Sequence, residues 1–256
     1  MLVPSAVPFA VQPFPASTGC TVAFVPYRVT SSEREVFEEQ FCTSSDALLE
    51  AQSECFMLLR RRNDVVMYGK LHSDYPISTP EYYAFSVFSS EEAARKCDTI
   101  ETTCTTLSES PLLWDATQIL HPSSSADTAL SPGVPAFLAT NRFPVRSECA
   151  ALFEERWAQR NSGLPSQPGF MGFSLLRRRG PLGKVGGEPE MYTYSTATLW
   201  ACEDAWQAWR EGGGKDAHVA SKTSNRTPVS EWMSGKASPI FFDVPVYVQR
   251  DVVNLA

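Results

Sequence analysis

The chain has 256 residues, a hydrophobic content of 43% and a formal net charge of −7. Its length favours two domains of roughly 100–150 residues, and its negative charge argues against nucleic-acid binding, which depends on clustered Lys and Arg. No apolar run approaches the roughly 18 residues that span a bilayer. The seven Cys residues form no CxxC pair, which predicts free thiols in a reducing compartment instead of a structural zinc site.

The first part of the chain predicts an arm followed by a domain. Residues 1–18 are rich in proline and uncharged, which suggests an N-terminal arm. Residues 19–120 alternate β-forming and helical segments, and Ser32 and Ser90 can each cap a helix whose first turn is acidic. In the order strand, helix, strand, strand, helix, the predicted elements cover 21–29, 31–52, 56–61, 82–88 and 90–106.

A segment rich in Ser, Pro and Gly at 121–135 predicts a linker, and residues 136–254 predict a second domain. Its elements follow the same order and end with one further strand. They cover 136–145, 147–162, 170–178, 192–200, 203–211 and 240–250. The order strand, helix, strand, strand, helix, strand is the ferredoxin-like pattern.

The two domains share a motif. FEE at 37–39 is followed by LLRRR at 58–62, and FEE at 153–155 by LLRRR at 175–179, with offsets of 21 and 22 residues. Each ferredoxin-like unit has an open sheet face, and two such faces in one chain can bury each other. We therefore predict an α+β protein whose tandem ferredoxin-like domains form a pseudo-dimeric α+β barrel within a monomer.

Three chemically capable residues occur only in the second copy. They are Asn141 on the first strand of that copy, Trp209 on its second helix and His218 beyond a run of three glycines. The matching positions of the first copy hold Val25, Cys97 and Thr106. A polar amide, a large aromatic ring and an imidazole are thus present in one half and absent from the matching positions of the other, which predicts a single functional site per chain.

The second half resembles a known family. The pattern is NRF on the first strand, FEERW on the first helix, PGFxGFxLLRR on the next strand and three tryptophans followed by Ala-His. Over about 136–250 it resembles the IsdG-type heme-degrading monooxygenases of the antibiotic-biosynthesis-monooxygenase fold. Two-domain, single-chain members occur in bacteria and as an algal heme oxygenase that responds to low iron, and this chain is similar to those. Trp209 and His218 lie nine residues apart, one fewer than is usual in the family.

The resemblance implies that heme is both substrate and cofactor, and that O2 and an electron donor, either a reductase or a small reductant, are consumed. His218 would be the axial ligand of the heme iron, for which imidazole is the commonest donor. Trp209 would press on a meso edge, and the Asn141 amide would donate to oxygen at the iron. Opening of the porphyrin at a meso carbon would release the iron.

The resemblance also suggests contacts around the porphyrin. Trp157 and Phe173 would line it, and Arg156 would lie at the rim near the propionates. The arginines that end each LLRRR motif are expected to be solvated strand ends, with propionate binding or reductase docking as the alternative. Each site residue also has an ordinary structural interpretation: Trp209 as core packing beside Trp206, Asn141 as a partner of the backbone, and Arg156 as an exposed arginine paired with Glu.

Two other functions stay open from the sequence. The protein could bind or transport heme without turnover, or it could be a cofactor-free monooxygenase of an aromatic substrate. We expect a soluble intracellular protein of a reducing compartment, either plastid or cytosol, where the plastid follows only from the algal resemblance.

Overall fold

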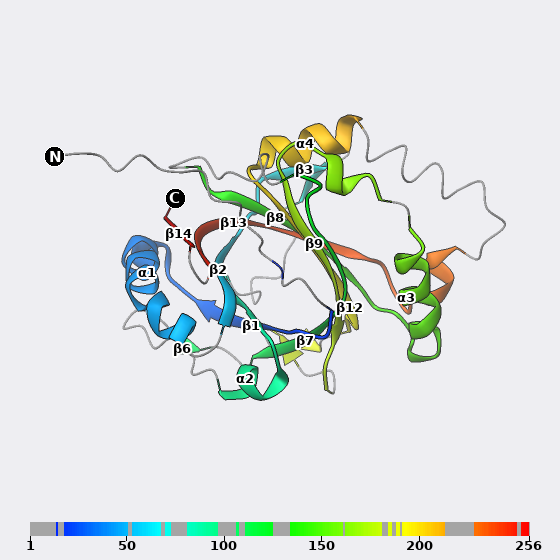
Figure 1. Ribbon diagram of the computed structural model, residues 1–256, viewed down its shortest axis with the longest axis horizontal. Helices are drawn as coiled ribbons and strands as arrows, with labels where there is room; N and C mark the ends of the chain where they lie inside the picture. Colours follow the sequence, from blue (N-terminus) through cyan, green and yellow to red (C-terminus); the bar gives the residue numbers. More distant parts are fainter. Residues whose placement is uncertain are drawn as a thin grey trace.

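The computed structural model describes residues 14, 18–50, 53–67, 70–72, 81–96, 106–107, 111–124, 134–160, 162–180, 184–185, 188–189, 191–212, 228–249 and 252–255. Eight strands close into one antiparallel barrel, and four helices lie on its outside (Figure 1). The barrel strands are β1 (Thr21–Arg28), β2 (Ser53–Arg61), β5 (Tyr82–Phe88), β7 (Leu112–Leu120), β8 (Ala136–Phe143), β9 (Phe170–Arg178), β12 (Tyr194–Trp200) and β13 (Ser238–Gln249). The helices are α1 (Arg34–Glu50), α2 (Glu91–Lys96), α3 (Ala150–Ala158) and α4 (Glu203–Gly212).

Short elements connect the barrel strands and helices. The short strands are β3 (Val65–Met67), β4 (Lys70–His72), β6 (Thr106–Leu107), β10 (Lys184–Val185), β11 (Glu188–Pro189) and β14 (Val252–Leu255). The 3-10 turns are η1 (Ser31–Glu33), η3 (Ser147–Cys149), η4 (Leu164–Ser166) and η5 (Val229–Trp232). The hairpin of β3 and β4 belongs to the first half but lies beside α4 of the second half, where Gln207 donates to the Val66 carbonyl at 3.4 Å.

The two halves have the same strand order, which confirms the tandem ferredoxin-like prediction. The order is β2-β5-β1-β7 in the first half and β9-β12-β8-β13 in the second. The last strand of each half also pairs with the other half: β7 pairs with β9, and β13 pairs with β2. The barrel therefore closes because β7 and β13, here called the exchanged strands, each pair with a strand of both halves, as in a dimer made from one chain.

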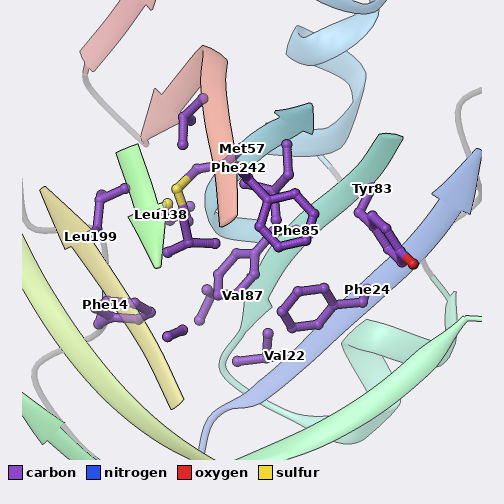
Figure 2. Packing of buried hydrophobic residues seen from close by; sticks show 14 of the residues in the cluster. Phe14, Val22, Phe24, Met57, Tyr83, Phe85, Val87, Leu138, Leu199 and Phe242 are labelled. Atoms are coloured by element: carbon purple, nitrogen blue, oxygen red, sulfur yellow. The ribbon is translucent and has the colours of Figure 1, made fainter. Parts of the chain in front are cut away.

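The barrel interior is filled by apolar side chains that alternate along the strands, as the period of two in a strand requires. Figure 2 shows residues from both halves meeting there, among them Phe85 and Val87 from the first half and Leu138 and Leu199 from the second. Phe14 reaches this core from the N-terminal segment; it is 1% exposed and packs edge-on against Phe85, with ring centroids 6.1 Å apart. Burial of one such ring contributes about 1.5–3 kcal/mol to the free energy of folding.

The shared FEE and LLRRR motifs have a structural explanation. Glu38 accepts hydrogen bonds from the Tyr82 hydroxyl at 2.7 Å and from Arg60 at 3.0 Å. In the second half, Glu154 accepts the corresponding bonds from Tyr194 at 2.6 Å and from Arg177 at 3.0 Å. Burial, followed by the adjacent glutamate, raises the pKa of both tyrosines. The repeated letters thus encode a helix-to-sheet contact, not a catalytic group.

Four arginines of these motifs form ion pairs, which the prediction of solvated strand ends did not include, and their side chains are 22–47% exposed. Arg60 and Arg62 both bind the carboxylate of Asp243 on the exchanged strand β13, at 3.0 and 2.8 Å. Arg177 and Arg179 bind Asp115 on the other exchanged strand, β7. Each aspartate therefore joins one half of the chain to the other. The sequence could not reveal these pairs because the partners are about 60 to 180 residues apart.

Two elements differ from the sequence prediction. The structure describes α2 only to Lys96, and Thr106, which was expected to end this helix, lies in strand β6 and pairs with Arg28. Strand β7 was not predicted. Its polar Asp115 and Gln118 and a β-bulge between Ala116 and Gln118 break the alternation by which strands are recognised.

Candidate functional site

A cavity of about 450 Å³ lies on the outer face of the second-half sheet, within the roughly 300–1,000 Å³ typical of small-molecule sites. The strand register shows that its floor comprises two neighbouring rows of residues across β7, β9, β12, β8 and β13. One row is Leu120, Phe173, Thr198, Ala139 and Phe241. The other is Gln118, Leu175, Thr196, Asn141 and Pro239. Small side chains in the middle of both rows leave the floor hollow.

Asn141 lies in the second of these rows, with its side chain available to a ligand. Its backbone N–H donates to Thr196 Oγ1 at 3.2 Å. Its side-chain oxygen is buried, and no residue in the described part of the chain hydrogen-bonds to it. A buried amide oxygen without a partner costs about 1–3 kcal/mol, so the cavity provides a place where a guest molecule or water can satisfy Asn141.

Aromatic rings form the walls. Trp157 of α3 stacks on Phe173 of β9, with centroids 5.6 Å apart and ring planes at 20°. Trp209 of α4 lines the cavity from another helix and packs against Trp200, with centroids 5.4 Å apart. Trp206 also lines the cavity, although it is 3% exposed and packs on Phe137 and Phe241. The walls therefore suit a flat, apolar guest.

Two cationic side chains line the cavity, and the sequence analysis had singled out neither. They are Arg160, just beyond α3, and Arg210 of α4. Burial, and after it the charge of Arg156, lowers the pKa of Arg160. Its guanidinium lies 5.0 Å from the Trp157 ring centroid, and no described carboxylate lies within ion-pair distance of it. A half-buried cation of this kind favours an anionic guest.

Arg156 does not line this cavity. Its guanidinium lies over the Trp232 ring, 5.6 Å from the centroid. Of the two arginines in this segment, Arg160 is the one that lines the cavity, three residues after Trp157. The signal that could have identified it was the helical spacing in RWAQR, because residues three apart lie on one helix face.

Asn141, Trp157, Phe173 and Trp209 thus line one cavity, although they come from four elements that are up to 68 residues apart in the chain. His218 lies outside the described residues, so its position is not tested and its role as an iron ligand stays a prediction. His121 follows β7, and both of its ring nitrogens are buried without a hydrogen-bond partner in the described chain. It is not among the residues that line the cavity.

The first half offers an internal comparison, because the corresponding rows there have the same register and different side chains. The counterparts of Gln118, Leu175, Thr196 and Asn141 are Val246, Leu58, Ala84 and Val25. All four are buried in one apolar cluster. The polar groups of the second-half row are therefore not a requirement of the fold, since the same frame is built without them in the first half.

The helix above the floor also differs between the halves. In both halves the first helix packs against the strand that joins the halves, α1 against β13 and α3 against β7, and α1 also packs closely against β2. The counterpart of Trp157 is Phe41, which stacks on Phe56 at 5.0 Å and 23° inside the apolar cluster. The aromatic pair is retained in both halves, and the hollow is formed where the row beneath it carries Thr196 and Asn141.

Comparison with known proteins agrees with this architecture. Residues 136–220 match the family model described as antibiotic biosynthesis monooxygenase. Two solved structures share the fold: a candidate monooxygenase from Fusobacterium nucleatum has a TM-score of 0.57 and 9% identity over 93% of this chain and 97% of its own. An anthrone oxidase-like protein has a TM-score of 0.54 and 16% identity, with the same two coverages. No helix in the described ranges is long and apolar enough to cross a membrane.

A curated relative indicates the group within this family to which the chain belongs. A mycobilin-producing heme oxygenase from Mycobacterium tuberculosis is 32% identical over 84 residues, which cover 33% of this chain and 71% of the relative. The aligned length fits within the second half, which contains the cavity and the family match. The chain therefore belongs to the antibiotic biosynthesis monooxygenase family, and within it to the IsdG-type heme-degrading monooxygenases.

Proposed function

We propose that this protein is a heme oxygenase with one active site, formed by the cavity between α3, α4 and the outer face of the second-half sheet. Heme is the substrate, and it also supplies the redox-active iron when it is bound. Dioxygen is reduced while the porphyrin is oxidised and opened at a meso carbon, and an external reductant supplies the remaining electrons. Iron and an open-chain tetrapyrrole leave the site.

The cavity supports this function because its side chains match the two parts of the substrate, which are the apolar ring and its carboxylates. The porphyrin is a flat apolar disc, and the stacked Trp157 and Phe173 with Trp209 provide flat apolar walls. The heme propionates are carboxylates, and Arg160 is a half-buried guanidinium without a described carboxylate partner. A bidentate arginine–carboxylate pair would neutralise this charge and fix the orientation of the disc.

Three residues are proposed to carry the reaction. The Asn141 carboxamide lines the cavity, and its N–H groups would donate to oxygen near the reacting edge of the ring. Trp209, held by packing on Trp200, would press the porphyrin out of plane, so that one meso position becomes the most reactive. His218 would bind the iron from the segment that follows α4.

The observation that carries the proposal is the contrast between the two halves. The same barrel positions hold Asn141, Thr196 and Gln118 beside the cavity and Val25, Ala84 and Val246 in the apolar cluster. An unused core position would be expected to remain apolar, because burying an unpaired amide destabilises the fold. The polar groups are better explained by a guest molecule.

The test is a hemin titration followed by ascorbate in air, with wild type, Asn141→Val and His218→Ala. Asn141→Val copies the side chain of the first half, and His72→Ala is the matched histidine control. Wild type should give a saturable one-to-one Soret band that decays as iron reaches a chelator. Asn141→Val should bind hemin but decay about tenfold more slowly or worse, and His218→Ala should shift or lose the band.

Two outcomes would contradict the proposal. A stable Soret band in wild type that never bleaches would indicate a heme-binding protein without turnover. Wild type that gives no Soret band would favour cofactor-free oxygenation of another aromatic substrate. His72→Ala should behave as wild type in each assay.

A further inference from the structure

The N-terminal half contributes directly to the floor of the second-half cavity. Strand β7 ends the first half and pairs with β9, so that Gln118 and Leu120 lie among the residues that line the cavity. Met67, from the β3–β4 hairpin of the same half, lines it as well. The cavity is therefore incomplete if only the second half is considered.

A β-bulge turns Gln118 toward this cavity. Trp114 and Ala116 point into the barrel interior, and without an irregularity Gln118 would follow them. The extra residue at Thr117 shifts the register, and its hydroxyl donates to the Leu175 carbonyl at 3.2 Å. Beyond the bulge the alternation is reversed, so that Gln118 faces outward. Bulges commonly re-aim a side chain beside a functional site.

Gln118 has no structural partner that would explain its polarity. Its side-chain oxygen is buried, and no residue in the described ranges hydrogen-bonds to its carboxamide. The first half carries the same bulge, between Asp243 and Val246 of β13, and the residue at the position of Gln118 there is Val246, which is 1% exposed in an apolar cluster. A valine would therefore satisfy the fold at this position, and the carboxamide costs stability unless a guest uses it.

Gln118 lies at the far end of the floor from Asn141. The two residues are separated by Leu175 and Thr196 in one row, three strand spacings of about 4.8 Å, or roughly 14 Å. The β7 side of the cavity is also the side of Arg160 and Ser162, because α3 packs on β7 and the Ser123 N–H donates to the Pro165 carbonyl at 2.7 Å. We infer that Gln118 and the half-buried Arg160 lie toward the same end of the cavity, since both line it and α3 packs on β7.

We propose that Gln118 is a substrate-positioning residue supplied by the N-terminal half. Rotation of its terminal amide exchanges the buried oxygen and the N–H2 group, so that the N–H can donate to a propionate of the bound tetrapyrrole. This inference rests on the heme function proposed above. It assigns the first half a role in substrate orientation: Gln118 and Arg160 hold the carboxylate edge, while Asn141 faces the reacting part of the ring. Hydrogen bonds to charged groups are strong enough for one such contact to be measurable.

The test uses the full chain with hemin and hemin dimethyl ester, the second of which lacks the propionate charge. Gln118→Leu removes the carboxamide and keeps a similar volume, Gln118→Glu places a negative charge in the same shape, and Gln159→Leu is the matched control at an exposed glutamine. Circular dichroism verifies that each variant is folded. Hemin affinity should fall about tenfold in Gln118→Leu and further in Gln118→Glu, and the preference for hemin over its ester should shrink in both.

A change in the hemin-to-ester ratio reports a contact with the carboxylate, because damage to the fold would weaken both ligands equally. Gln118→Leu that binds hemin with wild-type affinity and an unchanged ratio would overturn the role of Gln118 and leave the heme function intact. An equal loss for both ligands would also overturn it. Wild type that binds neither ligand would overturn this inference together with the proposed function.

Discussion

The indole of Trp157 lies almost parallel to the ring of Phe173, 5.6 Å from centroid to centroid, and this contact has a counterpart in the other half of the molecule. There Phe41 stacks on Phe56 at 5.0 Å. The first-half pair is sealed in an apolar cluster, and the second-half pair forms the wall of a cavity. The first half therefore has the same strand and helix arrangement as the second but, in the described part of the chain, without the cavity, and it serves as an internal comparison for the candidate site. Each difference between the halves can be tested by substitution.

Filling the cavity should remove binding without unfolding the protein. Thr198→Phe places a ring in the hollow floor, so hemin affinity should fall at least tenfold while the midpoint of urea unfolding is unchanged or higher. Ser86→Phe is the matched control, because Ser86 is the counterpart of Thr198 and is 3% exposed. It has no hollow to fill, and overpacking should cost about 1–3 kcal/mol. Equal destabilisation by the two substitutions would argue against a real cavity at Thr198.

The charge of Arg160 should matter for the ligand and not for the fold. Arg160→Met removes a half-buried cation that has no described carboxylate partner, so the free energy of unfolding should be unchanged or increased. Hemin affinity should fall about tenfold or more through the loss of a charge-assisted contact. Arg156→Met, which alters the contact with Trp232, is the comparison and should change hemin affinity less. A larger effect at Arg156 would support the prediction from the sequence that Arg156 lies at the rim near the propionates.

The carboxylates on the exchanged strands should contribute to stability. Asp243→Asn removes the charge shared by Arg60 and Arg62, and Asp115→Asn removes that shared by Arg177 and Arg179. Each should lower the free energy of unfolding by about 2 kcal/mol in urea titrations, because the side chains of Asp243 and Asp115 are only 11% and 17% exposed.

The control for these variants is Asp64→Asn. Asp64 also pairs with Arg62, but its side chain is 69% exposed, and the change should stay within about 0.5 kcal/mol. The two destabilising substitutions affect separate ion-pair clusters and should be additive in the double variant. Strong non-additivity would mean that the exchanged strands unfold as one coupled unit.

Stability should fall in alkaline solution. Burial raises the pKa of Cys20 from 9.0 to about 11 and that of Cys55 from 9.0 to about 12. Between pH 9 and its raised pKa, each thiol keeps its proton in the folded state and loses it in the unfolded state. The stabilisation is therefore complete below pH 9 and is lost as the pH rises toward the pKa of the folded state. Each group contributes a slope of at most about 1.4 kcal/mol per pH unit.

The measurement is the thermal midpoint from pH 8 to 11 for wild type, Cys20→Ala and Cys202→Ala. Cys20→Ala should reduce the alkaline slope, whereas the half-buried Cys202 serves as a thiol control. An identical slope in wild type and Cys20→Ala would show that the buried thiol does not contribute.

The sequence by itself was sufficient for the fold and for part of the site. The FEE and LLRRR motifs identified the repeat because they encode a local helix-to-strand contact, visible in Glu38 with Tyr82 and again in Glu154 with Tyr194. β-Strand alternation located most barrel strands, and the asymmetry between the copies indicated Asn141 and Trp209, both of which line the cavity. These signals are local, or they depend on comparing two copies of one pattern.

Only the tertiary structure revealed the contribution of the first half. The bulge at Thr117 reverses the inside-to-outside alternation of β7, and strand exchange then places Gln118 beside Leu175. Arg160 becomes distinctive only when its burial and the absence of a described carboxylate partner are seen. Register shifts and long-range strand pairing cannot be recognised from the periodicity of one sequence. They are stabilised by contacts between residues that are far apart in the chain. The amino-acid sequence therefore determined the ferredoxin-like fold and its repeat in the two halves. The closure of the barrel determined which side chains line the cavity together.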